Sequence, residues 1–250
     1  MRKTALSAFA AALVGAGSFA LVALGSGSGR PVDVAAANAR TAHADSVHYS
    51  FIVRVTKERQ PMILHIDGGS SRDAVAVHLR LDDLSSNMPG TTGAVLLSTP
   101  FLYEQAPGGI AVFGNVRWLR LQVSHLSPRS QTLSTVRSLT PSPLLHVIAE
   151  AKLHPGAAAG TFAGKVAYDD PIVRTALTSL TGGIEFRNLH VSVSVGADGL
   201  IHHVRITGRT ADHGTHFSLA ARLYAFGAPI EVVPPKPGTF LDRQLAEIAA

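Results

Sequence analysis

The side chains of this 250-residue chain that could do chemistry are, above all, its 12 histidines. His202 and His203 are neighbours in a run that alternates like a β-strand, so their side chains should point to opposite faces. His213 and His216 flank an expected turn. A metal site needs three or four converging ligands, so we interpret these histidines as solvated and expect no metal. His202 is the exception, because the strand pairing described below places it among apolar residues, where we expect a hydrogen-bonded core histidine.

Adjacent carboxylates at Asp169 and Asp170 could form a catalytic pair or cap a helix. Pro171 follows them at a position typical of a first helical turn, where negative charge is favourable, so we predict a cap. The chain contains no G-x-S-x-G, no H-E-x-x-H, no glycine-rich phosphate loop and no cysteine. The motifs of common hydrolases, metalloproteases and phosphate-binding enzymes are therefore missing. We expect a protein that has no catalytic residues, is not an enzyme and holds no cofactor.

The charge of the chain does not favour a nucleic-acid partner. Of its 22 lysines and arginines, Arg2 and Lys3 belong to an N-terminal targeting segment, which leaves 20 basic against 17 acidic residues. A surplus of this size along the chain is not a basic patch. The aromatic content of 6% is also low for a platform that stacks bases. We expect no nucleic-acid binding.

The N-terminal segment predicts export. Thr4–Gly25 carries no charged side chain and follows Arg2-Lys3, which is the layout of a secretion signal. The segment is also long enough to span a bilayer, which takes about 20 residues. It is therefore either cleaved after Ala23-Leu24-Gly25 or retained as an N-terminal membrane anchor. Ser26 stands where a lipoprotein would carry its acylated cysteine, and Ser26–Gly29 is a flexible spacer.

Residues 184–234 predict three consecutive antiparallel strands with one apolar face. Leu189, Val191, Val193 and Val195 alternate with polar residues, and the turn 196–199 follows. Matching the apolar positions across that turn gives the expected pairs Val195 with Leu200, Val193 with His202, Val191 with Val204 and Leu189 with Ile206. The same matching across the next turn sets Phe217, Leu219 and Leu223 opposite Ile206, Val204 and Leu200. We expect a one-sided antiparallel sheet.

The rest of the chain predicts more strands and a few helices. Alternation predicts strands over Val47–Val55, Met62–Ile66, Val75–Leu81, Ala94–Ser98, Phe101–Glu104, Ile110–Phe113, Arg117–Val123 and Phe162–Tyr168. Asp67-Gly68-Gly69 should end the second of these with a turn. Helices are expected in Pro31–Ala44, twice in Ser130–Lys152 with Ser142 as a cap, after Asp170-Pro171, and over Phe240–Ala250. Few, segregated helices beside a continuous strand ladder predict an α+β fold with the helices on one sheet face.

At this level of detail the chain resembles the LppX/LprG-like envelope proteins of actinobacteria, whose fold is similar to that of the LolA-type lipoprotein carriers. The matching pieces, in order over residues 32–237, are Ala42–Val47; Leu102-Tyr103 before Arg117-Trp118-Leu119; Pro143-Leu144-Leu145; Gly160–Gly164 leading to Tyr168; Gly196–Leu200; and Tyr224–Pro229 before Val233-Pro234-Pro235. The chain departs from the family in lacking the lipobox cysteine. The resemblance implies a single large, strongly curved antiparallel sheet, a half-barrel, with helices against its concave side.

The resemblance also implies a hydrophobic cavity between half-barrel and helices that holds acyl chains of envelope lipids. A curved apolar face covered by a few short helices is physically suited to leave such a space. The inward-facing residues expected to line the cavity are Tyr49, Phe51, Val53, Leu64, Val77, Leu79, Val191, Val193, His202, Val204 and Leu219.

Two functions stay open at this point. In the first, the protein binds or shuttles lipid acyl chains at a membrane surface. In the second, core side chains fill the half-barrel, and the protein is an extracytoplasmic interaction module with a protein partner in the cell envelope. The expected organisation is a signal peptide or anchor over residues 1–25, a spacer over 26–31, the half-barrel domain over 32–237, and a C-terminal helix or tail over 238–250. The expected location is extracytoplasmic, in the cell envelope or secreted, with the protein either released or held by an uncleaved N-terminal helix.

Overall fold

The computed structural model describes residues 32–57, 60–83, 90–105, 117–127, 130–181 and 184–242. The expected export segment, the spacer, the strand Ile110–Phe113 and the chain after Asp242 lie outside these residues. The strands are β1 Ser46–Lys57, β2 Gln60–Ser71, β3 Ala74–Asp83, β4 Thr91–Ser98, β5 Phe101–Gln105, β6 Trp118–Gln122, β7 Lys152–Pro155, β8 Thr161–Val166, β9 Arg187–Val195, β10 Ile201–Arg209, β11 Thr215–Tyr224 and β12 Phe240–Asp242. The helices are α1 Val34–Ala42, α2 Gln131–Ser138, α3 Ser142–Glu150 and α4 Pro171–Thr181, with a 3-10 turn, η2, at Val123–His125.

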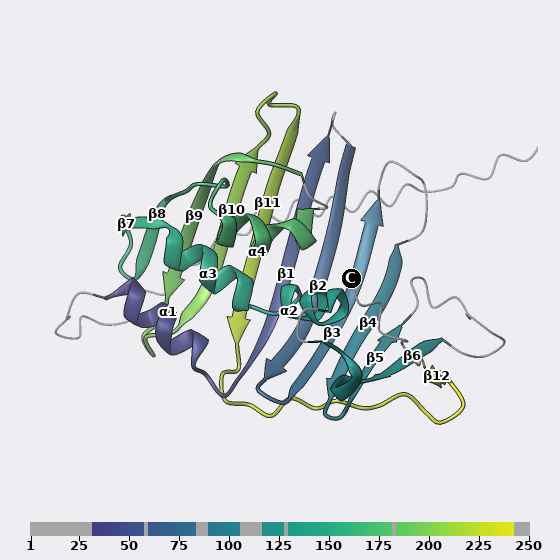
Figure 1. Cartoon of the computed structure of the whole chain (residues 1–250). Coiled ribbons are helices and arrows are strands. Elements are labelled where there is room, and N and C mark those ends of the chain that lie inside the picture. Colours follow the sequence, from purple (N-terminus) through teal and green to yellow (C-terminus); the bar gives the residue numbers. More distant parts are fainter. Residues whose placement is uncertain are drawn as a thin grey trace, which may run out of the picture. The chain divides into compact units, whose positions relative to one another are not determined.

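These strands form one sheet in the order β12-β6-β5-β4-β3-β2-β1-β11-β10-β9-β8-β7 (Figure 1). β1 lies in the interior of the sheet and pairs with β2 on one side and β11 on the other. The N-terminal and C-terminal runs of strands therefore meet at β1. Neighbours are antiparallel except β12, which runs parallel to β6. The predicted α+β class with one large antiparallel sheet is confirmed.

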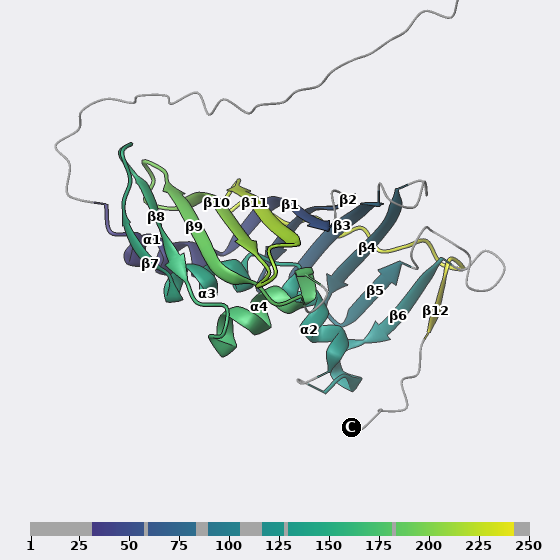
Figure 2. The same cartoon turned by 90° about the horizontal axis from the view of Figure 1, so that it is seen from above.

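The four α-helices of the described residues lie on one face of this sheet, and the sheet curves around them (Figure 2). α3 packs against α1, α2 and α4, and α1 also contacts β10. One buried row crosses the strands beneath the helices through Phe51, Ala221, Val204 and Val193, which pair in register. The predicted placement of the helices on one face is therefore confirmed. Within the described residues, no helix combines the length and the hydropathy needed to cross a bilayer.

The predicted pairing of β9 with β10 is wrong by one residue at Val195 and by two residues at Val193 and Val191. Val195 pairs with Ile201, and Val193 pairs with Val204, with an irregularity between Ile201 and His203. This irregularity takes His202 out of the alternation and turns Ile201, which is 0% exposed, into the core. Burying isoleucine in place of an imidazole is favourable because it leaves no polar ring to satisfy.

The predicted pairing of β10 with β11 is also displaced by two residues, because Ile206 pairs with Leu219 and Val204 with Ala221. A shift by two residues keeps the same side chains on the same face, since the side-chain period of a strand is two. The predicted apolar face of β10 and β11 therefore survives the wrong register at Val204, Ile206 and Leu219, which are buried.

The predicted turn at Asp67-Gly68-Gly69 is wrong, because β2 continues through both glycines to Ser71. A Cβ atom on Gly68 would lie 2.6 Å from the carbonyl oxygen of Ala76 and 3.0 Å from the ring of Tyr49. A Cβ atom on Gly69 would lie 2.6 Å from Cδ1 of Ile230, in the segment that leads to β12. The two glycines therefore admit close neighbours, one from within the sheet and one from the C-terminal segment.

Three further expectations differ from the structure at element ends. Ser142 is the first residue of α3 and not its cap, since Pro141 takes the cap position without a side-chain hydrogen bond. β7 was not predicted, because this four-residue strand is short, mostly polar and contains Pro155. Such strands are common at the edge of a sheet. The cap by Asp170 is confirmed, with its Oδ1 accepting a hydrogen bond of 3.2 Å from the Val173 amide.

The predicted helix from Phe240 is wrong at its start, where residues 240–242 form β12. This strand lies beyond residue 237, the expected end of the half-barrel. The Arg120 guanidinium of β6 donates to both carboxylate oxygens of Asp242 and lies over the rings of Phe101 and Phe240, at 4.7 and 4.4 Å from their centroids. These contacts hold the last strand against β6, which local helical spacing cannot reveal.

Candidate ligand-binding site

Ten of the eleven residues predicted to line a cavity lie on the helix-bearing face of the sheet. Eight of these are buried: Tyr49, Phe51, Val53, Val77, Val191, Val193, Val204 and Leu219. Leu64 and Leu79 are half-buried and pack against the same core. The structure therefore brings ten predicted side chains into one continuous apolar surface.

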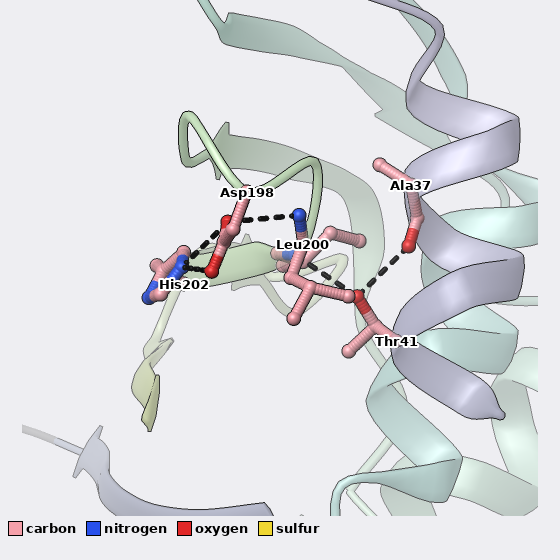
Figure 3. Close-up of polar contacts among 6 residues, drawn as sticks. Ala37, Thr41, Asp198, Leu200 and His202 are labelled. Atoms are coloured by element: carbon pink, nitrogen blue, oxygen red, sulfur yellow. Dashed lines mark hydrogen bonds and ion pairs between the residues drawn. The ribbon is translucent and has the colours of Figure 1, made fainter. Parts of the chain in front are cut away.

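The expected place of His202 on this apolar surface is wrong. Its Nε2 lies 3.0 and 2.9 Å from the two carboxylate oxygens of Asp198, at the turn between β9 and β10 (Figure 3). The Leu200 amide donates to the same carboxylate at 3.1 Å. Partial burial opposes ionisation of Asp198, but these hydrogen bonds outweigh it and lower the pKa of the carboxyl. His202 therefore stabilises the turn, and the side chain of Ile201 takes its expected place on the apolar face.

The same turn is joined to α1 by Thr41. Its hydroxyl donates to the carbonyl of Ala37 at 2.8 Å and accepts from the amide of Ile201 at 2.9 Å (Figure 3). Thr41 is buried, so both groups would otherwise be left without a partner away from water. This contact positions the first helix at the start of β10.

Over β1 and β9–β11 the helices close the apolar face. Val147 of α3 and Val173 and Leu177 of α4 are 0% exposed, as are Leu189 and Leu219 of the sheet. A space wide enough for an acyl chain would leave some of the side chains around it partly exposed. The layer between these helices and these strands is therefore filled by side chains.

Over β2–β4 the same face is incompletely covered. Leu64 pairs with Leu81 and Leu79 pairs with Gly93, and all four are half-buried. Met62, on the same face, is 37% exposed. A Cβ atom on Gly93 would meet no atom within 4 Å. We call these five residues, Met62, Leu64, Leu79, Leu81 and Gly93, the apolar shelf.

Sequence reasoning found Leu64 and Leu79 but missed the rest of the shelf. Met62 and Leu81 belong to the same alternating runs, so period two was a sufficient signal for both. Gly93 carried no such signal, because a glycine in a strand has no side chain to assign to a face. Its importance comes from the open space above it, which only the packed structure shows.

One side chain of the core, Tyr49, carries a buried hydroxyl. Tyr49 is 0% exposed, and its hydroxyl has no hydrogen-bond partner among the described residues. Its ring stacks on Phe51 with a centroid distance of 4.8 Å, and Gly68 lies against the hydroxyl end. Burial raises the pKa of Tyr49, so the phenol is neutral. A neutral phenol is compatible with its apolar surroundings in the core.

The described residues contain no group of three or more His, Asp, Glu or Cys side chains that could hold a metal ion. The histidines singled out in the sequence form no such group among the described residues. The site is therefore an apolar surface, and its chemistry is that of binding by burial of apolar area.

No known protein family and no curated protein matches this sequence. Among solved structures, the Mycobacterium tuberculosis lipoprotein LppX is similar over 80% of this chain and 98% of its own, with 13% identity and a TM-score of 0.40. A DUF1329 family protein from Desulfovibrio piger is similar over 80% of this chain and 96% of its own, with 4% identity and a TM-score of 0.20. Neither likeness assigns this chain to a family, and membership of the LppX/LprG-like family stays a prediction.

Proposed function

We propose that this protein is an exported carrier that binds the acyl chain of a lipid on its apolar shelf. The observation that carries the proposal is the incomplete cover of Leu64, Leu79 and Gly93 on a sheet face that helices seal over β1 and β9–β11. Each methylene group that leaves water for such a surface contributes about 0.8 kcal/mol. A chain of several methylenes can therefore bind without any polar contact.

Export is part of the proposal and rests on the N-terminal segment. Arg2-Lys3 followed by the uncharged Thr4–Gly25 has the layout of a secretion signal or membrane anchor. A carrier in the cell envelope would meet lipids at the membrane surface, where acyl chains are available. Retention by the N-terminal segment would keep the carrier there without a lipid anchor.

Lipid content is the direct test. The protein purified from its own host under mild conditions should carry lipid, which solvent extraction and mass spectrometry of the native protein would detect. Finding no co-purifying lipid, and no binding of a fluorescent fatty acid, would remove the carrier function.

Gly93→Phe places the test on the shelf. The phenyl ring would occupy the open space above Gly93 while the strand gains a residue that favours β-structure. Excluding about two methylene groups costs about 1.6 kcal/mol, so we expect the affinity for a fluorescent fatty acid to fall more than tenfold.

The matched control is Thr92→Phe, one residue earlier in β4. Thr92 is exposed and pairs with Arg80, on the opposite face of the sheet. This variant should bind fatty acid as the unchanged protein does. Equal affinity of the Gly93 variant and the Thr92 variant would place any bound lipid elsewhere.

The second function, a protein-interaction module without a lipid ligand, is favoured by the sealed layer over β1 and β9–β11. It predicts a stoichiometric protein partner that co-purifies from the host envelope and no extractable lipid. The lipid measurement above separates the two functions.

A further inference from the structure

The strands on one side of the sheet centre carry no acidic residue. β1 and β8–β11 contain no aspartate and no glutamate, whereas their basic residues are Arg54, Lys57, Lys165, Arg187, Arg205, Arg209 and Arg222. The apolar side chains of these strands are buried beneath the helices, so Arg54, Arg205, Arg209 and Arg222, at the alternate positions, occupy the opposite face. The chain as a whole has only a small basic surplus, and folding concentrates it on this outer face.

Strand pairing brings several of these side chains side by side. Arg209 pairs with Arg187 on one side and with His216 on the other. In the neighbouring row, Thr207 pairs with His190 and with Ser218, and Ser218 pairs with Arg54 of β1. Like charges directly opposite each other in a sheet are destabilising unless something compensates them.

These rows line a recess of about 700 Å³ at the end of the sheet. Its charged and titratable lining residues are Arg54, Arg187, Arg209, His190, His213 and His216. Among the described residues that line it, none is acidic. The three arginines are exposed, and none of them forms a salt bridge within the described part of the chain.

The carboxylates nearest in sequence do not line this recess, although Asp212 interacts electrostatically with His213, which does. Asp212, in the turn between β10 and β11, accepts hydrogen bonds from the Thr210 hydroxyl and the Gly214 amide. Glu185 lines a different recess, which it shares with Arg187 and with further acidic and basic side chains: Glu150, Asp169, Asp170, Lys152, Lys165 and Arg174. Arg54 and Arg209 are therefore the cations with the clearest access to a bound anion.

We propose that this recess binds a phosphate group of a ligand, with Arg54, Arg187 and Arg209 as its cationic contacts. A guanidinium group can donate two parallel hydrogen bonds to the oxygens of one phosphate. Arginine is therefore common in the phosphate-binding sites of proteins. The recess is large enough to hold more than the phosphate itself, since ligand pockets span about 300–1,000 Å³. The phosphate belongs either to a lipid headgroup or to a free phosphorylated molecule. This site goes beyond the proposed acyl-chain function and lies on the other face of the sheet.

The test measures two probes with the full chain. Isothermal titration calorimetry with pyrophosphate reports a free phosphate ligand, and co-sedimentation with phosphatidylcholine vesicles, with and without phosphatidylglycerol, reports a headgroup. A charge-assisted hydrogen bond typically changes affinity by about tenfold or more. We therefore expect Arg54→Gln and Arg209→Gln each to weaken binding of the relevant probe about tenfold.

Arg222→Gln is the matched control. Arg222 lies on the same face of β11, carries the same charge and contacts the Tyr224 ring, but it does not line the recess. This variant should bind both probes as the unchanged protein does. Binding of pyrophosphate alone identifies a free ligand, and binding that requires phosphatidylglycerol identifies a headgroup.

Two results would overturn the site. One is that the protein binds neither pyrophosphate nor vesicles with phosphatidylglycerol. The other is an equal loss in Arg222→Gln and Arg209→Gln, which would show general attraction to a basic face and no defined recess. Gly93→Phe should leave the phosphate measurement unchanged, so failure of the acyl-chain function and failure of this site can be told apart.

Discussion

The Tyr49 hydroxyl is buried in the interior of the sheet without a hydrogen-bond partner among the described residues. Leaving such a group unpaired costs about 1–3 kcal/mol. We therefore expect Tyr49→Phe to leave the free energy of unfolding unchanged or to raise it by about 1 kcal/mol, measured by chemical denaturation.

Tyr168→Phe is the comparison for that measurement. The Tyr168 hydroxyl donates to the carbonyl of Ile184 at 2.9 Å, so its removal should lower the free energy of unfolding by about 1 kcal/mol. If both variants lose the same stability, the Tyr49 hydroxyl has a partner in solution, and a bound ligand is then the first candidate to examine.

His203 is the residue whose charge should limit stability in acid. Burial, followed by the nearby Arg222 and His202, lowers the pKa of His203 in the folded state. As the pH falls below about 6.5, the unfolded chain takes up the proton first, so the folded state loses stability. We expect His203→Gln to reduce the loss of stability between pH 7 and pH 5, as measured by thermal unfolding.

His78→Gln is the control for the removal of one imidazole, because His78 is an exposed histidine of β3. An unchanged pH dependence in His203→Gln would show that other groups set it.

At the scale of elements, the absence of a side chain at Gly68 allows β2 to pack closely against β3. The Cβ atom of an alanine at position 68 would press on the backbone of Ala76, which cannot move without shifting β3. We expect Gly68→Ala to lower the free energy of unfolding by about 1–3 kcal/mol, as overpacking does.

Gly93→Ala is the control for that variant, because Gly93 lies in a neighbouring strand with free space above it. Alanine there should be neutral or should stabilise the strand by about 0.5–1 kcal/mol, measured by the same denaturation. A tolerated alanine at position 68 would mean that β2 and β3 can move apart, against the close packing described above.

Elements with a strong local period were predictable. β1, β3, β9, β10 and β11 follow alternation, and α4 follows its cap and spacing. The pairing between β9 and β10 was not predictable in this way, because it depends on whether the side chain of Ile201 or that of His202 enters the core. Which side chain enters the core depends on the packing of the whole apolar layer and on the contact of His202 with Asp198. The sequence of the turn does not show either of these.

At the scale of the whole molecule, the two faces of one sheet have different chemistry. The helix-bearing face is apolar, with the shelf over β2–β4, and the outer face of β1 and β8–β11 is basic. Amino-acid composition averages these faces together. The small net charge of the chain therefore gave no sign of the recess, and nucleic-acid binding still lacks support because the recess is local.

The amino-acid sequence by itself determined the α+β class, the side chains of each strand that are apolar, and the absence of cysteine chemistry. These follow from local periodicity and composition, which need no partner strand. The tertiary structure decided the strand register, the use of Gly68 and Gly69 for close packing, the sealed and open parts of the helix-bearing face, and the gathering of arginines across β1, β9 and β10. Each of these depends on residues far apart in the chain, whose distances are set only when the packed core selects one arrangement.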